Sequence, residues 1–221
     1  MQIKSLTLQN FRRYSNAVTI EFENLTAFVG KNDVGKSSIL EALDIFFNDG
    51  RGCIKLDKDD INKIEASRGN NEVSIAVCFE NLPDTVVIDA TNETTLESEY
   101  LLNESCQLEI VKKYPNAGSA KVFIRAYHPT NPNCSDLLLK KDSDLRKILS
   151  SQSIACEDQT RNAVMRKAIW ERYSDDLQLC PCRSVKTDHI DRIIGGGKTF
   201  LHLFRLSPPA VPVARIYRDL I

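Results

Sequence analysis

The stretch Gly30-Lys31-Asn32-Asp33-Val34-Gly35-Lys36-Ser37 decides how this chain folds. Its two glycines leave the backbone uncovered, so that successive N–H groups can point at the oxygens of one anion. Lys36 adds an ammonium group and Ser37 a hydroxyl at the position where a helix should start. This spacing is that of a Walker A motif, and it predicts a loop that binds a polyphosphate.

The segments on either side of the loop have the periodicities that the motif requires. Leu25 to Val29 is a nearly continuous apolar run, which predicts a buried strand that ends directly at Gly30. From Ser37 the apolar residues recur at helical spacing, and the helix should end near Asn48-Asp49-Gly50. The residues of its apolar face are Ile39, Leu40, Leu43, Phe46 and Phe47. Strand, glycine loop and helix therefore follow in the required order.

The chemistry of the loop predicts ATP and Mg²⁺ as cofactors. Lys36 should reach the β- and γ-phosphates, and the hydroxyl of Ser37 should coordinate Mg²⁺. The residues expected to hold the nucleotide are Gly30, Lys31, Asn32, Asp33, Val34, Gly35, Lys36, Ser37 and Ser38. No catalytic residue can be assigned. The similar stretch Gly195 to Thr199 has Arg192 where the leading glycine should be, so we interpret it as a chance match.

Composition excludes several classes of protein. With 42% hydrophobic and 27% charged residues among 221, the chain should form a globular domain. Its formal net charge of -1 gives no overall attraction to nucleic acid or to a membrane surface. Neither a membrane-spanning run nor a signal peptide is recognisable, and seven scattered cysteines suit a reducing compartment. We therefore expect a cytoplasmic protein without membrane contacts.

Outside the loop the patterns indicate antiparallel strands and a few helices. Ile3 to Leu8 and Val18 to Phe22 should form strands before the loop, and Val73 to Phe79 a further one. Gln107 to Tyr114 and Lys121 to His128 read as a hairpin. Helical composition returns at 137–147 and 162–170.

The carboxyl end of the chain predicts a separate segment. From Arg183 onward basic residues outnumber acidic ones, while Gly195 to Gly197 and three prolines interrupt every periodic pattern. We expect a domain over residues 1–188 and an irregular basic tail over residues 189–221. The tail would be a contact to DNA or a solvated end, and a truncated or non-native end of the chain is a further interpretation.

The opening residues 3–14, the loop with Ser38, and Ile39 to Leu43 resemble the amino-terminal half of ABC-type DNA-repair ATPase heads. That class includes SMC proteins, RecF-like proteins and the OLD family (overcoming lysogenization defect). The chain looks most like the OLD family of ATP-dependent endonucleases, which act in bacterial phage defence. The resemblance implies an α/β fold of P-loop NTPases, as an ABC-type ATPase head lobe with added antiparallel strands.

The same resemblance implies site residues and partners. Lys36 and Ser37 would bind phosphate and magnesium, and Arg12 or Arg13, after Asn10-Phe11, would reach the nucleotide. The partner would be a second copy of the chain, or a complementary ATPase or nuclease subunit, with DNA bound by the complete assembly. The family's Walker B, signature and Toprim nuclease segments are not recognisable here, so this lobe should be incomplete for hydrolysis alone, as a fragment or a natural truncation.

Two other functions stay open on the sequence. The apolar run Val86-Val87-Ile88-Asp89 could supply a magnesium carboxylate, Asp89, to a self-contained P-loop kinase-like enzyme. Alternatively, the chain is a non-catalytic regulator in which ATP only stabilises the fold.

Overall fold

A computed structural model describes residues 1–28, 35–50, 52–89 and 92–186. The chain divides into two compact units. In the described part, the first unit consists of Met1–Asn81 and Val111–Lys121, and the second of residues 82–110 and 122–186. The site discussed below lies in the first unit.

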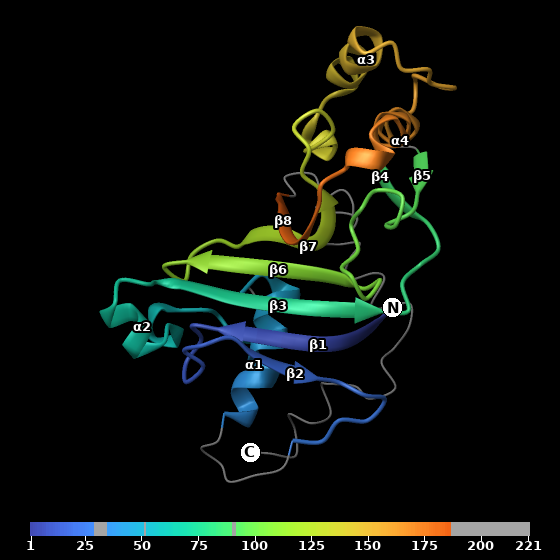
Figure 1. The fold of residues 1–221 in the computed structure, drawn as a ribbon. Helices are drawn as coiled ribbons and strands as arrows, with labels where there is room; N and C mark the ends of the chain where they lie inside the picture. Colours follow the sequence, from blue (N-terminus) through green and yellow to red (C-terminus); the bar gives the residue numbers. More distant parts are fainter. Residues whose placement is uncertain (29–34, 51, 90–91, 187–221) are drawn as a thin grey trace. The chain divides into compact units, whose positions relative to one another are not determined.

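An antiparallel sheet forms the framework of the first unit (Figure 1). It contains β1 (Gln2–Gln9), β2 (Val18–Glu21), β3 (Glu72–Glu80) and β6 (Leu108–Pro115), in the order β2-β1-β3-β6. Leu6 of β1 lies opposite Ile20 on one side and Val77 on the other. Only residues 111–115 of β6 belong to this unit. The antiparallel strands predicted on both sides of the loop are therefore confirmed.

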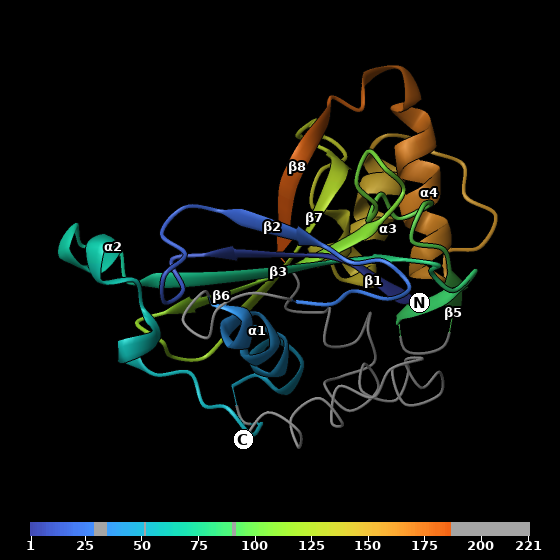
Figure 2. The same ribbon diagram turned by 90° about the horizontal axis from the view of Figure 1, so that it is seen from below.

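Helix α1 (Lys36–Asn48) lies on one face of this sheet (Figure 2). Its residues with buried side chains are Ser38, Ile39, Ala42, Leu43, Ile45 and Phe46. The helix ends at the predicted place, because Asp49 has a left-handed conformation and its N–H binds the Ile45 carbonyl. From β6, Lys112 Nζ donates to the Phe46 carbonyl at 2.8 Å, so the sheet also holds the end of the helix.

The polar segment that follows α1 contains two short helices. A 3-10 turn, η1 (Lys58–Asp60), precedes α2 (Lys63–Ser67). Asn62 caps α2, since its side-chain oxygen accepts from the N–H groups of Ile64 and Glu65. The segment is therefore ordered and can hold neighbouring side chains.

The second unit has its own strands and helices. Strand β7 (Lys121–Pro129) pairs antiparallel with β8 (Leu179–Lys186); all of β7 except Lys121 belongs to this unit. A second pair of strands is formed by β4 (Val86–Asp89) and β5 (Asn92–Thr94). The remaining elements are η2 (Leu137–Leu139), α3 (Asp142–Ser151), α4 (Asn162–Arg172) and η3 (Ser174–Asp176). A cluster around Trp170, whose indole N–H donates to the Cys134 carbonyl at 3.0 Å, forms its core.

One ion pair of the second unit is buried. Arg166 of α4 donates from Nε to one oxygen of Glu99 at 2.7 Å and from a terminal nitrogen to the other at 2.8 Å. The two side chains are only 2% and 1% exposed. Thr94 donates a further hydrogen bond to Glu99 at 3.0 Å. Buried charges persist in proteins only with such complete pairing.

The prediction of a strand at Leu25 to Val29 is wrong for residues 25–28, the part of this stretch that the structure describes. Residues 25–28 form no strand, and Leu25 is 76% exposed. The backbone turns instead, with the Glu23 N–H donating to Thr26 Oγ1 at 2.9 Å. Apolar composition had indicated burial, but a strand needs a partner for its backbone groups, and here a local side chain supplies one.

One predicted helix and one predicted strand differ from the structure, and one strand was not predicted. The helix expected at 137–147 is a 3-10 turn followed by α3 at Asp142–Ser151, since Lys140 and Lys141 have extended backbones between them. Strand β3 is buried at five successive residues, Ile75 to Phe79, and not only on one face. Sequence periodicity did not predict β8, which contains Cys180 and Pro181.

Two further predictions concern the carboxyl-terminal tail and membrane contacts. The tail at 189–221, including Gly195 to Thr199, lies outside the described residues. Among the residues that are described, no helix is long and apolar enough to cross a membrane.

Candidate nucleotide-binding site

The beginning of α1 has a backbone conformation that suits the binding of an anion. Gly35 precedes the helix in a left-handed conformation, with φ 88° and ψ 12°. Gly35, the residue that caps this end, has no side chain to form a capping hydrogen bond, and the described first turn of α1 carries no acidic residue. The first backbone N–H groups of a helix need an outside partner, and the helix dipole favours a negative one.

The predicted loop residues are described only in part. Gly30, Lys31, Asn32, Asp33 and Val34 lie outside the described residues. Gly35, Lys36, Ser37 and Ser38 are described, and Lys36 is the first residue of α1.

The two serines of this stretch differ in exposure. The Ser37 side chain is exposed, whereas Ser38 is buried and its hydroxyl lies 3.4 Å from Arg12 Nη1, which donates to it. Of the two, Ser37 is therefore the hydroxyl that could coordinate a metal.

A tight turn brings the residues after β1 to this helix end. The N–H of Phe11 binds the Tyr14 carbonyl at 3.0 Å, and the N–H of Tyr14 binds the Phe11 carbonyl at 2.8 Å. Asn10 and Arg12 both have left-handed backbones, with φ of 54° and 50°. Side-chain hydrogen bonds from Asn10 to the carbonyls of Asn70 and Glu72 attach the turn to the beginning of β3. The turn is therefore fixed from several sides.

Arg12 lies within a cluster of charges. Its Nε donates to Asp60 at 2.8 Å, and its Nη1 pairs with Glu41 of α1. Burial lowers the pKa of Arg12, but the hydrogen bonds and charges of Asp60 and Glu41 act in the opposite direction and leave it above its ordinary value. One guanidinium thus connects the turn, the helix and the segment after it.

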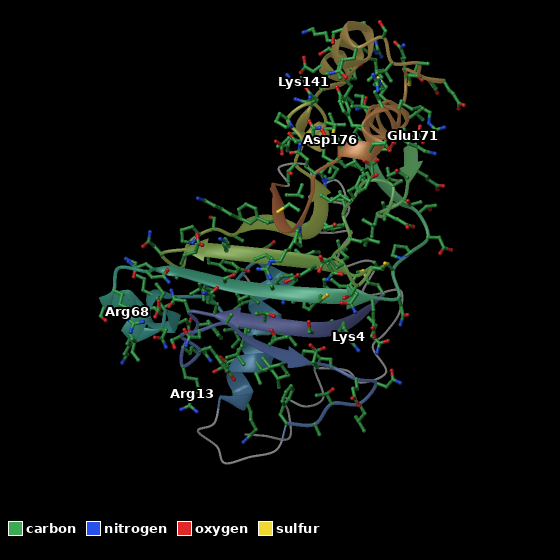
Figure 3. The ribbon with its side chains drawn as sticks, in the orientation of Figure 1. Lys4, Arg13, Arg68, Lys141, Glu171 and Asp176 are labelled. Carbon is green, nitrogen blue, oxygen red and sulfur yellow. The ribbon has the colours of Figure 1, made fainter. Side chains whose placement is uncertain are left out.

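Arg13 lies against Gly35, at the beginning of α1 (Figure 3). A Cβ atom placed on Gly35 would be 2.8 Å from Arg13 Cδ and 3.1 Å from the Tyr14 hydroxyl. Tyr14 donates to the Gly35 carbonyl at 3.3 Å. The Arg13 side chain is exposed. No carboxylate forms an ion pair with it among the residues that the structure describes.

These features fit a magnesium nucleotide. Only glycine combines the left-handed backbone of residue 35 with the close approach of Arg13 and Tyr14. Lys36, the exposed Ser37 hydroxyl and the first backbone N–H groups of α1 are groups of the kind that bind phosphate and Mg²⁺. The arrangement can hold a polyphosphate.

Residues 1–180 match the family model of the AAA ATPase domain. The chain belongs to the AAA ATPase domain family. The α/β fold of P-loop NTPases predicted from the sequence is thereby confirmed, as is the function of this domain in binding ATP. No curated protein matches the chain.

Solved structures of SMC heads are similar to this AAA ATPase domain over part of its length. One, from work on ATP-driven dimerization and DNA-stimulated activation of SMC ATPases, is 20% identical over 70% of this chain and 81% of its own, with a TM-score of 0.38. The SMC head domain of Thermotoga maritima is 16% identical over 57% of this chain, with a TM-score of 0.34. A Pyrococcus yayanosii head with coiled coil is 22% identical over 71%, with a TM-score of 0.37. The chain spans 38% and 26% of the latter two.

Several residues of the site were not predicted from the sequence. Glu41 lies in the predicted helix but was not distinguished from other polar positions, and Asp60 and Asn62 lie in a segment to which no role was assigned. Asn62 Nδ2 donates to the Arg12 carbonyl at 2.6 Å. The capping pattern of Asp57 and Asp60, like Asn62 three residues before Glu65, is a sequence signal that this segment is ordered.

The other candidate residue, Asp89, belongs to the second unit. Strand β4, which ends at Asp89, pairs with β5 in a two-stranded sheet and is not a member of the sheet that contains β1 and β3. Within the described residues, no group of three or more His, Cys, Asp or Glu could hold a metal ion.

Proposed function

We propose that this AAA ATPase domain is the ATP-binding lobe of an OLD-like ATPase, which couples ATP binding and hydrolysis to DNA processing in phage defence or DNA repair. The single observation that carries the proposal is the beginning of α1, where the left-handed Gly35 precedes Lys36 and Ser37 in Walker A order and two arginines lie nearby. The OLD-like assignment is supported by the opening residues 3–14 and by the antiparallel strands on both sides of the loop.

Each residue of the site has a distinct role in this proposal. Lys36 neutralises the β- and γ-phosphates, and Ser37 supplies a hydroxyl ligand to Mg²⁺. Backbone N–H groups of Gly30 to Ser38 surround the phosphates, and an arginine from Arg12 or Arg13 adds a charge. Bound Mg²⁺ would neutralise the developing charge of the transferred phosphoryl group. The protein's own groups bind and orient the nucleotide.

The assembly belongs to the proposal as well. The partner is a second copy of the chain, or a complementary ATPase or nuclease subunit, which supplies charge and water-orienting groups to the nucleotide. DNA binds to the complete assembly. The division into a domain at 1–188 and a basic tail at 189–221 stays a prediction.

Nucleotide binding by Lys36→Ala tests the proposal. A fluorescent ATP analogue titrated with Mg²⁺ should bind the purified chain, and Lys36→Ala should lose most of this affinity while its thermal melt is unchanged. Lys63→Ala is the matched control, because Lys63 is an exposed lysine at the start of α2. Equal affinity of both variants would remove the proposal.

Turnover separates the two other functions. A kinase-like enzyme that uses Asp89 should hydrolyse or transfer phosphate steadily as a purified single chain, and Asp89→Asn should abolish this. A regulator should bind ATP without turnover, even when mixed with partner subunits.

A further inference from the structure

We propose that the two adjacent arginines have different roles: Arg13 contacts the nucleotide phosphates, and Arg12 is a positioning residue that holds Arg13 at the beginning of α1. This inference rests on the proposed function, because it assigns roles at the same site. The family resemblance alone left the choice between the two arginines open.

Arg12 is bound by protein groups on three sides, although its side chain is still 29% exposed. Its guanidinium binds Asp60, Glu41 and the Ser38 hydroxyl, on three different parts of the fold. The side chains of Glu41 and Asp60 are 15% and 14% exposed. Since two carboxylates face one guanidinium, this cluster carries a net negative charge and has no surplus cation for a phosphate.

The backbone of Arg12 is bound by protein groups too. Its N–H donates to the Asp60 carbonyl at 2.6 Å, and its carbonyl accepts from Asn62 Nδ2 at 2.6 Å. The Asn62 N–H in turn lies 3.4 Å from the Asn10 carbonyl, to which it donates. Side chain and main chain together fix residue 12, and hence the direction in which the next residue leaves the turn.

Arg13 has the opposite character. Its stem packs on Gly35, 2.8 Å from where a Cβ would lie, and its side chain is exposed. A guanidinium extends several ångströms beyond Cδ, so Arg13 can place a planar, permanently charged fork beside the first turn of α1. Such a fork matches the geometry of phosphate oxygens.

Glu41→Gln distinguishes positioning from direct contact. If Arg12 were the nucleotide ligand, removing a competing carboxylate would release it and also reduce repulsion of phosphate, so affinity for ATP would stay or rise. If Arg12 positions Arg13, the loosened turn should weaken ATP binding in spite of the lost negative charge. Glu65→Gln is the matched control, since Glu65 of α2 pairs with Arg68, outside the cluster.

The measurement is a titration with a fluorescent ATP analogue and Mg²⁺. We expect Arg13→Ala to weaken binding about tenfold or more, the effect of one hydrogen bond to a charged group. Glu41→Gln should weaken it severalfold in the wild-type chain and should add no further loss in the Arg13→Ala background. A structural effect on folding alone would weaken binding in both backgrounds.

The outcomes separate this inference from the proposed function. Unchanged affinity in Arg13→Ala, or equal or higher affinity in Glu41→Gln, would overturn the division of roles while Lys36→Ala still loses binding. If Lys36→Ala retains affinity, the proposed function itself fails. Should Glu41→Gln unfold at the assay temperature, Asp60→Asn removes the other carboxylate of Arg12 and gives the same test.

Discussion

Replacing Arg166 by alanine should destabilise the second unit far more than the same change at its neighbour Lys167. Both residues lie in α4 and both form ion pairs, Arg166 with Glu99 and Lys167 with Glu171. Burial differs: the first pair is 2% and 1% exposed, and the second is 66% exposed on both sides. Arg166→Ala leaves a buried carboxylate without its partner, which costs about 3–5 kcal/mol. Lys167→Ala should cost less than about 0.5 kcal/mol.

Thermal melts followed by circular dichroism give the measurement. For a chain of this size about 1 kcal/mol shifts the melting temperature by roughly 2–4 °C, so Arg166→Ala should lower it by about 6–20 °C. The double variant Arg166→Met with Glu99→Leu should recover most of this loss, because an apolar pair leaves no buried charge. The reasoning is refuted if Arg166→Ala melts together with Lys167→Ala, or if the double variant is less stable than Arg166→Ala.

Two further predictions concern a glycine and a carboxylate. Gly35→Ala should lower the affinity for ATP, because the new Cβ would lie 2.8 Å from Arg13 Cδ and the left-handed backbone would add a strain of about 1–2 kcal/mol. Gly69→Ala is the control: Gly69 has φ +84° but no atom within 4 Å of a Cβ, so this variant should lose stability and keep its affinity. Binding titrations and thermal melts of both variants give the comparison. Burial raises the pKa of Glu109, against the charge and hydrogen bond of Arg125. The folded chain therefore binds this proton more tightly than the unfolded chain. Stability should fall as pH rises from the ordinary glutamate pKa through the raised one, and Glu109→Gln should flatten that part of a pH series of denaturation curves.

Short sequence patterns predicted the elements that are fixed by neighbouring residues in the chain, such as a helix end, a strand and a hairpin turn. The helix end at Asp49 follows from a left-handed residue at a helix terminus, and the strand at Val73 to Phe79 from its β-branched and apolar residues. The antiparallel hairpin was recognisable from its turn, in which the Gly118 N–H binds the Pro115 carbonyl at 2.9 Å.

Predictions failed where long-range contacts decide the outcome. Leu25 resembles a strand residue by composition, yet 76% of it is exposed, since burial depends on which surface the fold provides. Strand β8 contains Pro181, a residue that argues against a strand, and forms at the sheet edge beside β7.

The residues of the candidate site also divide into those that neighbour one another in the chain and those that meet only in the fold. Gly35, Lys36 and Ser37 could be named from their spacing, because a phosphate loop is contiguous in the chain. Glu41 and Asp60 could not, since they join the site through Arg12 only after the chain has folded back on itself. Adjacency in sequence likewise could not separate Arg12 from Arg13, whereas their different surroundings can.

The three-way connection of Arg12 also constrains how sequences of this family can diverge. A change at residue 12 alone leaves two carboxylates facing each other, and a change at Glu41 or Asp60 alone leaves the guanidinium with one partner fewer. Homologues that have lost the arginine should therefore also have replaced both acids, and these three alignment columns should vary together, while exposed Arg13 should track only the residues of the phosphate loop.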